Sequence, residues 1–395
     1  MGMCVQEYVR NPRGMKLFSC RWVPTKSDEI KGQVFLCHGY AVECAVTMRG
    51  TGERLAGAGF AVYGLDYEGH GRSEGLQGYV PDFNALVADC DAFFVSKTTA
   101  TYSRFLLGES MGGTVALLLH RSRPDFWTGA VLVAPMCKIS DDMKVNPALA
   151  NVLRAVTSII PTWKVVPSND VIDFAYKTQE KRDEIRRNPY CYKGKPRLKT
   201  AYELVKASMH IEANLLHQVT MPFLIVHGGA DKVTDPSVSE LLYRSAASQD
   251  KTFKVYPGMW HALTSGESPD NIRTVFRDII EWLNQRTEGQ PEMNKLPDTT
   301  TSNSMKVFAM HDNGECALEK TLLLGKTIPG LSCTWLYRPV RILTRGPGFI
   351  ILLLQAFGKW IVSVDLETME VASGVDYMRP MVYPFELPWP QRLRR

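Results

Sequence analysis

The stretch that decides the fold runs from Arg104 to His120 and reads Arg-Phe-Leu-Leu-Gly-Glu-Ser-Met-Gly-Gly-Thr-Val-Ala-Leu-Leu-Leu-His. Its first apolar run predicts a short buried strand that ends at Gly108. Its second apolar run predicts a helix that begins near Gly112. Between the two runs, Ser110 stands in Gly-x-Ser-x-Gly, the spacing of a nucleophile elbow, which is a sharp strand-to-helix turn that exposes a serine hydroxyl.

Glycines at positions 108 and 112 fit the physical needs of such a turn. The backbone on both sides crowds the strained serine, so the residues two before and two after it must lack a Cβ atom. The N-terminus of the following helix points at the serine, where its unpaired N–H groups favour developing negative charge. We therefore predict that Ser110 is a nucleophile and that Gly108 and Gly112 are the elbow glycines.

A second match to the same pattern, Gly71-Arg72-Ser73-Glu74-Gly75, lacks this context. A Gly-His-Gly segment separates Ser73 from the nearest predicted strand. The residues behind it, 76–81, cannot start a helix directly. We interpret Ser73 as a loop residue.

Composition indicates a globular protein. The chain has 395 residues, of which 45% are hydrophobic and 22% charged, and its net charge is +5. This charge is too small to argue for nucleic-acid binding, and no nucleic-acid motif is present. The N-terminus has no apolar core, so we do not expect a signal peptide. The nine cysteines form no Cys-x-x-Cys pair, which favours buried thiols in a reducing compartment over disulfides or zinc.

Apolar strands alternate with helical patterns along much of the chain, which predicts an α/β fold with a mostly parallel sheet covered on both faces. This rhythm stops between about residues 136 and 219, where amphipathic helical patterns predict an inserted lid. Strands are predicted at 17–23, 33–37, 60–65, 105–107, 129–134, 223–227 and 252–256, and helices at 48–58, 83–95, 237–247 and 271–285.

The last part of the chain differs from the rest in composition and in its pattern of apolar residues. Residues 287–304 are polar and contain proline, which predicts a linker after a main domain of residues 1–286. Short β-like runs at 349–354 and 360–365 then suggest a small β-rich appendage that occupies residues 305–395.

A serine nucleophile needs a base, and the base needs an orienting acid. Behind an elbow of this kind the acid and then the histidine follow along the chain, each on a loop after a strand. Asp231 stands three residues after Gly228, and His261 stands five residues after Tyr256. We predict that Ser110, Asp231 and His261 form a catalytic triad.

Other residues compete for these roles. Asp235 could be the acid, but it precedes Pro236 and looks like the first residue of a helix. His38 and His227 fit structural roles better, and a loop-bracing role suits His70 better than base chemistry. The remaining histidines, at 120, 210, 217 and 311, are most simply surface or packed residues.

The oxyanion of an acyl-transfer intermediate needs two backbone donors. One is the N–H of Met111, directly after the nucleophile, and the other belongs to the loop after the first buried strand, where we assign it to Tyr40. No metal-ligand spacing, dinucleotide fingerprint or phosphate loop is present, so the sequence implies no cofactor.

Together these motifs resemble the monoacylglycerol lipase-like family of α/β-hydrolases, in particular the plant branch that includes caffeoylshikimate esterase. The resemblance covers residues 5–286 and rests on five segments. It implies an α/β-hydrolase fold and a cytosolic or peripherally membrane-bound carboxylic ester hydrolase, with Ser110 as nucleophile, Asp231 as orienter and His261 as general base. The segments are His38-Gly39-Tyr40, Asp66 to Ser73, Gly108 to Gly113, Asn188-Pro189-Tyr190-Cys191-Tyr192, and His227 to Asp231 with Thr234-Asp235-Pro236.

Two features depart from that family. Ala41 stands where the family pattern has glycine after His-Gly-Tyr, a change that would narrow the oxyanion loop. The tail beyond residue 304 has no place in the family. It resembles the C-terminal region of some grass F-box-type proteins, as a gene fusion or a mis-joined gene model would produce.

Three functions compete at this point. The first is a serine esterase or lipase whose small-molecule substrate is a monoacylglycerol, a lysophospholipid or a phenolic ester such as caffeoylshikimate. The second is an acyltransferase with the same triad, and the third is a non-catalytic small-molecule receptor on this fold. The apolar and aromatic lid would suit either ester class and could contact membranes peripherally, and the oligomeric state is open.

Overall fold

The computed structural model describes residues 3–24, 30–99, 101–137, 156–164 and 170–287, together with strands in the C-terminal part. The chain forms two compact units, Met1–Pro291 and Glu292–Arg395. Within the described residues, no helix is both long enough and apolar enough to cross a bilayer.

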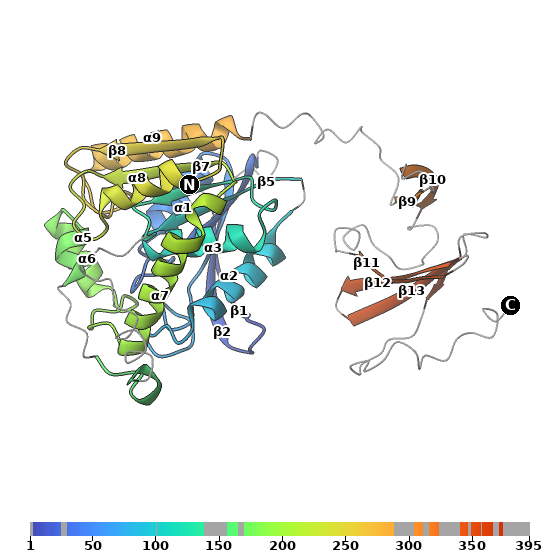
Figure 1. Ribbon diagram of the computed structural model, residues 1–395, viewed down its shortest axis with the longest axis horizontal. Helices are drawn as coiled ribbons and strands as arrows, with labels where there is room; N and C mark the ends of the chain where they lie inside the picture. The colour runs from blue at the N-terminus through green and yellow to red at the C-terminus, as the bar shows by residue number, and fades with distance from the viewer. Residues whose placement is uncertain are drawn as a thin grey trace. The chain divides into compact units, whose positions relative to one another are not determined.

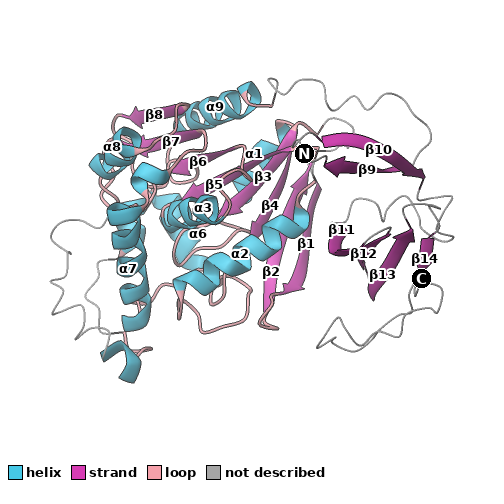
Figure 2. Ribbon diagram, turned by 45° about the vertical axis from the view of Figure 1, so that its right-hand side comes forward, coloured by secondary structure: helices cyan, strands magenta, loops and turns pink. Residues whose placement is uncertain are grey.

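An eight-stranded sheet forms the centre of the first unit (Figures 1 and 2). The strand order is β1-β2-β4-β3-β5-β6-β7-β8. The pairs β1–β2 and β2–β4 are antiparallel, and the neighbouring pairs from β4 to β8 are parallel. The order shows that the predicted mostly parallel sheet is present. The strands are β1 (Met3–Arg10), β2 (Lys16–Val23), β3 (Gly32–Cys37), β4 (Phe60–Leu65), β5 (Ser103–Glu109), β6 (Gly129–Val133), β7 (Phe223–Gly228) and β8 (Lys251–Tyr256).

Helices cover both faces of this sheet because alternate strand residues point to opposite faces. Val34 and Leu36 pack with the side chains of α1 (Arg49–Gly57) and α9 (Pro269–Gln285). Phe35 lies on the opposite face of the sheet. That face packs with α2 (Phe83–Lys97), α3 (Met111–Ser122), α7 (Leu198–Asn214) and α8 (Pro236–Ser245). The all-apolar strands in the centre are buried on both faces.

The predicted lid, residues 136–219, is described in part. Its described elements are α5 (Val171–Ala175), α6 (Gln179–Arg187), α7 and the short 3₁₀ helix Leu216–Gln218. Residues 138–155 and 165–169 lie outside the described residues. In the part that is described, the lid is helical and contains no strand, as its amphipathic patterns predict.

The second unit contains strands alone among its described elements. One antiparallel pair is β9 (Ser304–Met310) with β10 (Cys316–Leu323). A second sheet has the order β11-β12-β13-β14 and is antiparallel throughout. Its strands are Val340–Gly346, Phe349–Ala356, Gly358–Asp365 and Val371–Ser373. The predicted linker lies outside the described residues apart from Thr287 and Ser304.

Candidate active site

Ser110 occupies the turn between β5 and α3, and its backbone is strained as an elbow requires. Its φ of +54° and ψ of −116° place it in a region that side-chain-bearing residues rarely adopt. A Cβ atom at Gly112 would overlap the carbonyl oxygen of Cys37, and a Cβ atom at Gly108 would overlap the carbonyl of Gly112. The two glycines thus let β3, β5 and α3 meet closely behind the serine.

Neighbouring strands fix the backbone of the elbow. The Ser110 N–H donates to the carbonyl of Val133 at 3.0 Å. The Ser110 carbonyl accepts from the N–H groups of Met136 and Gly113, both at 2.9 Å. Because both polar backbone groups of Ser110 are engaged, its side chain stays at the C-terminal edge of the sheet, where loops carry functional groups in such folds.

Asp231 and His261 are brought together by the loops that follow β7 and β8. The His261 Nδ1 atom lies 2.7 Å from Asp231 Oδ2, and the Thr234 hydroxyl donates to the same oxygen at 2.9 Å. The other oxygen, Oδ1, accepts from the N–H groups of Val233 at 2.7 Å and Thr234 at 3.1 Å. The Asp231 side chain is fully buried, whereas that of His261 is 10% exposed.

The charge state of Asp231 follows from these donors. Burial raises the pKa of this carboxyl, but hydrogen bonds from His227 and His261, the positive character of His261 and the Val233 N–H outweigh burial and hold the pKa below its usual range. An ionised, buried carboxylate at this point orients the imidazole of His261 and stabilises its protonated form.

The elbow and the histidine loop are linked through other residues. The Thr264 hydroxyl donates to Glu109 Oε1 at 2.8 Å, and the Thr234 hydroxyl lies 3.2 Å from the carbonyl of Ala134. No hydrogen bond joins the Ser110 hydroxyl to another residue in the described part of the chain. Hydrogen bonds of this kind are often long in ligand-free active sites and tighten with substrate.

The predicted oxyanion donors lie on both sides of the serine. An ideal Cβ built at Gly39 would be 3.6 Å from the Ser110 Cβ, so the loop after β3 runs directly past the nucleophile. Within the described residues, the backbone N–H groups of Tyr40 and Met111 donate to no other protein atom. Ala41 has a φ of +67°, which explains why the family pattern has glycine there.

The competing residues have other partners in the structure. Ser73 accepts a hydrogen bond from the Phe18 N–H at 2.9 Å and donates to the Asp66 carbonyl at 2.6 Å, so it braces a loop. Asp235 caps α8 by accepting from the Ser237 N–H at 2.8 Å. His38 is buried, and its ring donates to the Gly39 carbonyl at 2.8 Å and accepts from the Tyr67 N–H at 3.1 Å.

Of the other histidines, His227 contacts Asp231 with Nε2 at 3.1 Å, whereas His70, His120 and His210 have other partners. His70 is buried and donates from Nδ1 to the Glu68 carbonyl at 3.1 Å, while burial lowers its pKa to about 4. His120 accepts from the Thr220 N–H at 3.1 Å. His210 contacts Arg121. His311 lies outside the described residues.

Sequence reasoning missed a buried network between the oxyanion loop and the lid. Glu43 is fully buried, and its carboxylate accepts from Thr47, from the Val46 N–H and from the Asn188 amide at 3.0 Å. The Asn188 amide also contacts Cys191 Sγ at 3.2 Å. The Asn-Pro-Tyr-Cys-Tyr segment that carried part of the resemblance therefore anchors the lid beside the site.

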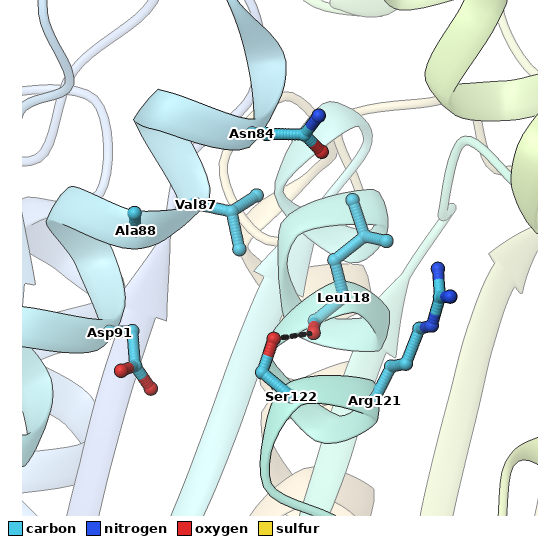
Figure 3. Close-up of a pocket in the computed structure, with 7 residues that line it drawn as sticks. All are labelled: Asn84, Val87, Ala88, Asp91, Leu118, Arg121 and Ser122. Carbon is cyan, nitrogen blue, oxygen red and sulfur yellow. Dashed lines mark hydrogen bonds between the residues drawn. The ribbon is translucent and has the colours of Figure 1, made fainter.

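A separate surface pocket of about 330 Å³ lies between α2 and α3 (Figure 3). Its acidic residue, Asp91, already pairs with Arg123 at 2.7 Å. None of the predicted site residues lines it. Among the residues that the structure describes, no group of three or more His, Cys, Asp or Glu side chains could hold a metal ion. The lining residues are Asn84, Val87, Ala88, Asp91, Leu118, Arg121 and Ser122.

The sequence of the chain matches a known family and known proteins. The family model described as serine aminopeptidase, S33, matches residues 28–268. The chain belongs to this family. It is 37% identical to caffeoylshikimate esterase of Arabidopsis thaliana over 288 residues, which are 72% of this chain and 86% of that protein. It is 31% identical to monoglyceride lipase of Homo sapiens over 284 residues, which are 70% of this chain and 89% of that protein.

Solved structures confirm the α/β-hydrolase fold. The crystal structure of a soluble variant of monoglyceride lipase from Saccharomyces cerevisiae, in complex with a substrate analog, superposes with a TM-score of 0.62 at 22% identity. The alignment covers 71% of this chain and 94% of that one. Family and relatives together identify the chain as a serine-type carboxylic ester hydrolase.

Proposed function

We propose that this enzyme hydrolyses its ester through an acyl-enzyme formed on Ser110, with His261 as general base and Asp231 as the residue that orients it. The observation that carries this proposal is the 2.7 Å hydrogen bond between His261 Nδ1 and the buried Asp231, on loops that adjoin the elbow. This bond leaves Nε2 of His261 as the ring nitrogen that can take a proton from the serine.

The reaction then proceeds in two halves. The Ser110 oxygen attacks the ester carbonyl while its proton moves to His261, and the N–H groups of Tyr40 and Met111 stabilise the oxyanion. The tetrahedral intermediate collapses, the ester C–O bond breaks, and His261 gives its proton to the leaving alcohol. Water, deprotonated by His261, next attacks the acyl-enzyme and releases the carboxylic acid and free Ser110.

For the substrate, we propose a phenolic ester such as caffeoylshikimate, with monoacylglycerols and lysophospholipids as the second candidates. The chain matches a relative named caffeoylshikimate esterase and relatives named monoglyceride lipase. Aromatic groups also stand beside the oxyanion loop, where the rings of Tyr40 and Tyr192 pack edge to face with centroids 6.5 Å apart. Aromatic rings at this position could contact a planar phenolic ring through stacked or edge contacts.

Hydrolysis by the full-length protein tests the proposal, with caffeoylshikimate and a monoacylglycerol offered side by side and Ser110→Ala as the control. Turnover of caffeoylshikimate that Ser110→Ala abolishes supports the phenolic-ester proposal. Turnover of the monoacylglycerol alone moves the substrate to the lipid class. An added alcohol acceptor separates hydrolysis from acyl transfer, because a transferase produces a new ester at the expense of free acid.

We further propose that the lid contacts membrane surfaces and that the enzyme works in the cytoplasm. Ile159 and Trp163 are 79% and 57% exposed, and the lysines at 164, 193 and 195 are exposed as well. The Leu198 N–H ties this segment to α7 through the Trp163 carbonyl at 2.8 Å. Co-sedimentation with vesicles that contain phosphatidylserine should weaken in Trp163→Ser and not in Val255→Ser, an exposed residue of β8.

A further inference from the structure

We propose that His227 is a positioning residue for the reaction: from strand β7, its imidazole donates a hydrogen bond to Asp231. This inference rests on the proposed function, because Asp231 acts through His261. His227 lies in β7 and is fully buried. Its Nε2 atom is 3.1 Å from Asp231 Oδ2, the same oxygen that His261 contacts.

The partners of His227 define where its proton resides. Besides the carboxylate, Nε2 faces the carbonyl oxygen of Thr234 at 3.1 Å. Both of these atoms accept hydrogen bonds, so Nε2 must carry the proton and donate. The other nitrogen, Nδ1, lies 2.7 Å from the Ser239 hydroxyl. That hydroxyl is buried on α8 and donates to the Nδ1 lone pair, which fixes the tautomer.

This arrangement gives Asp231 a donor that does not belong to its own turn. Val233 and Thr234 provide donors from the loop itself, and His261, the residue that this carboxylate orients, donates from the loop after β8. His227 is held by the sheet and by Ser239, so the carboxylate keeps its orientation toward His261 independently of the loop. A donor to the charged form also opposes burial, which favours the protonated acid.

Two variants of the same residue separate this role from simple packing. In His227→Gln the amide nitrogen takes approximately the place of Nε2 and can still donate to Asp231. In His227→Asn the shorter amide takes approximately the place of Nδ1, beside Ser239, and leaves Asp231 without this donor. Both replace the ring by a smaller amide, so lost packing alone would affect Gln and Asn in the same direction.

The experiment measures kcat/KM of the full-length protein against pH with p-nitrophenyl butyrate as the probe. We expect His227→Asn to lower kcat/KM by about 10- to 100-fold, the factor that a lost hydrogen bond to a charged group typically costs. The acidic limb of its pH profile should move to higher pH, because a carboxylate that has lost a donor makes the coupled Asp231–His261 pair hold its proton more strongly. The kcat/KM of His227→Gln should stay within about threefold of the wild-type value, and the acidic limb of its pH profile should not move.

Equal losses in the two variants, with unchanged acidic limbs, would overturn the inference. A second measurement decides it if His227→Asn fails to fold: the ¹⁵N spectrum of histidine-labelled wild-type protein. The signal of His227 is assigned by its absence from the spectrum of His227→Gln. Protonation of His227 on Nε2 with a bare Nδ1 supports the inference, and the opposite tautomer at His227 overturns it. An inactive wild type would contradict the proposed function alone, because the tautomer is read without turnover.

Discussion

The hydroxyl of Thr264 donates a 2.8 Å hydrogen bond to Oε1 of Glu109, the residue directly before Ser110. Thr264 lies three residues after His261, so this bond ties the loop of the proposed base to the elbow of the proposed nucleophile. Burial raises the pKa of Glu109, against the lowering effects of the Thr264 hydrogen bond and the positive character of His261. Glu109 is thus a partly buried acid whose hydrogen-bonding capacity serves the alignment of two loops.

Replacement of Thr264 by valine keeps the shape of the side chain and removes this bond. We expect kcat to fall about 5- to 30-fold, since a hydrogen bond to an acidic group is worth about 1–2 kcal/mol, while KM changes little. Steady-state kinetics measure the split. Thr274→Val is the control, because among the described residues the Thr274 hydroxyl bonds only the Asp270 carbonyl, within α9. Equal kinetics in the two variants would show that the bond does not align the loops.

A side chain in place of an elbow glycine should destabilise the protein strongly through steric overlap. Gly112→Ala places a methyl group against the carbonyl of Cys37. This carbonyl belongs to the backbone of β3, so it can move away only if β3 moves. We expect loss of soluble protein or a fall in the free energy of unfolding of about 3 kcal/mol or more, as for other overpacked sites. Gly57→Ala is the matched control, because a Cβ atom there meets nothing within 4 Å. Urea unfolding of both variants gives the comparison, and a Gly112→Ala protein of wild-type stability would be incompatible with the elbow geometry.

Ala41 stores backbone strain beside the oxyanion loop. At a φ of +67° a side chain costs about 1 kcal/mol relative to glycine, so Ala41→Gly should raise the free energy of unfolding by roughly 0.5–1 kcal/mol. The same change at Ala56, inside α1, should instead lower it by roughly 1 kcal/mol. Thermal or urea unfolding distinguishes the two signs. A lower stability for Ala41→Gly would mean that the positive φ carries no strain.

His70 predicts a pH-dependent contribution to stability. Burial lowers its pKa to about 4 in the folded protein, below the value of about 6.5 in an unfolded chain. The folded state therefore favours the neutral ring, so the contribution of His70 is complete above pH 6.5 and declines as the pH falls toward 4. The slope is at most about 1.4 kcal/mol per pH unit.

His70→Asn removes this titration and keeps an amide donor near the position of Nδ1, which faces the Glu68 carbonyl. The free energy of unfolding of the wild type should therefore fall relative to that of the variant between pH 6.5 and 4. Urea unfolding at several pH values measures this difference, and a constant difference would contradict the buried, neutral assignment. Activity at pH 7 should remain within about threefold if His70 braces its loop, as its contacts indicate.

The sequence predicts the central sheet well because fully apolar runs such as Phe223–Val226 are buried on both faces. It misses β1, whose side chains from Cys4 to Arg10 are largely exposed, so that pairing with β2 and not burial forms this edge strand. Side-chain directions at strand ends depend on how neighbouring loops meet. For that reason the Thr264–Glu109 bond and the donation from His227 to Asp231 are visible only in the structure.

The central claim is that Ser110, and no other serine, is the nucleophile. The most direct measurement treats the full-length protein with a fluorophosphonate, digests it with trypsin and maps the adduct by mass spectrometry. The two Gly-x-Ser-x-Gly segments fall in different tryptic peptides, residues 105–121 for Ser110 and 73–97 for Ser73. We predict an adduct on Ser110 alone, lost in Ser110→Ala together with at least about 10³-fold of the esterase activity. An unlabelled Ser110, or activity that survives Ser110→Ala, would contradict the account.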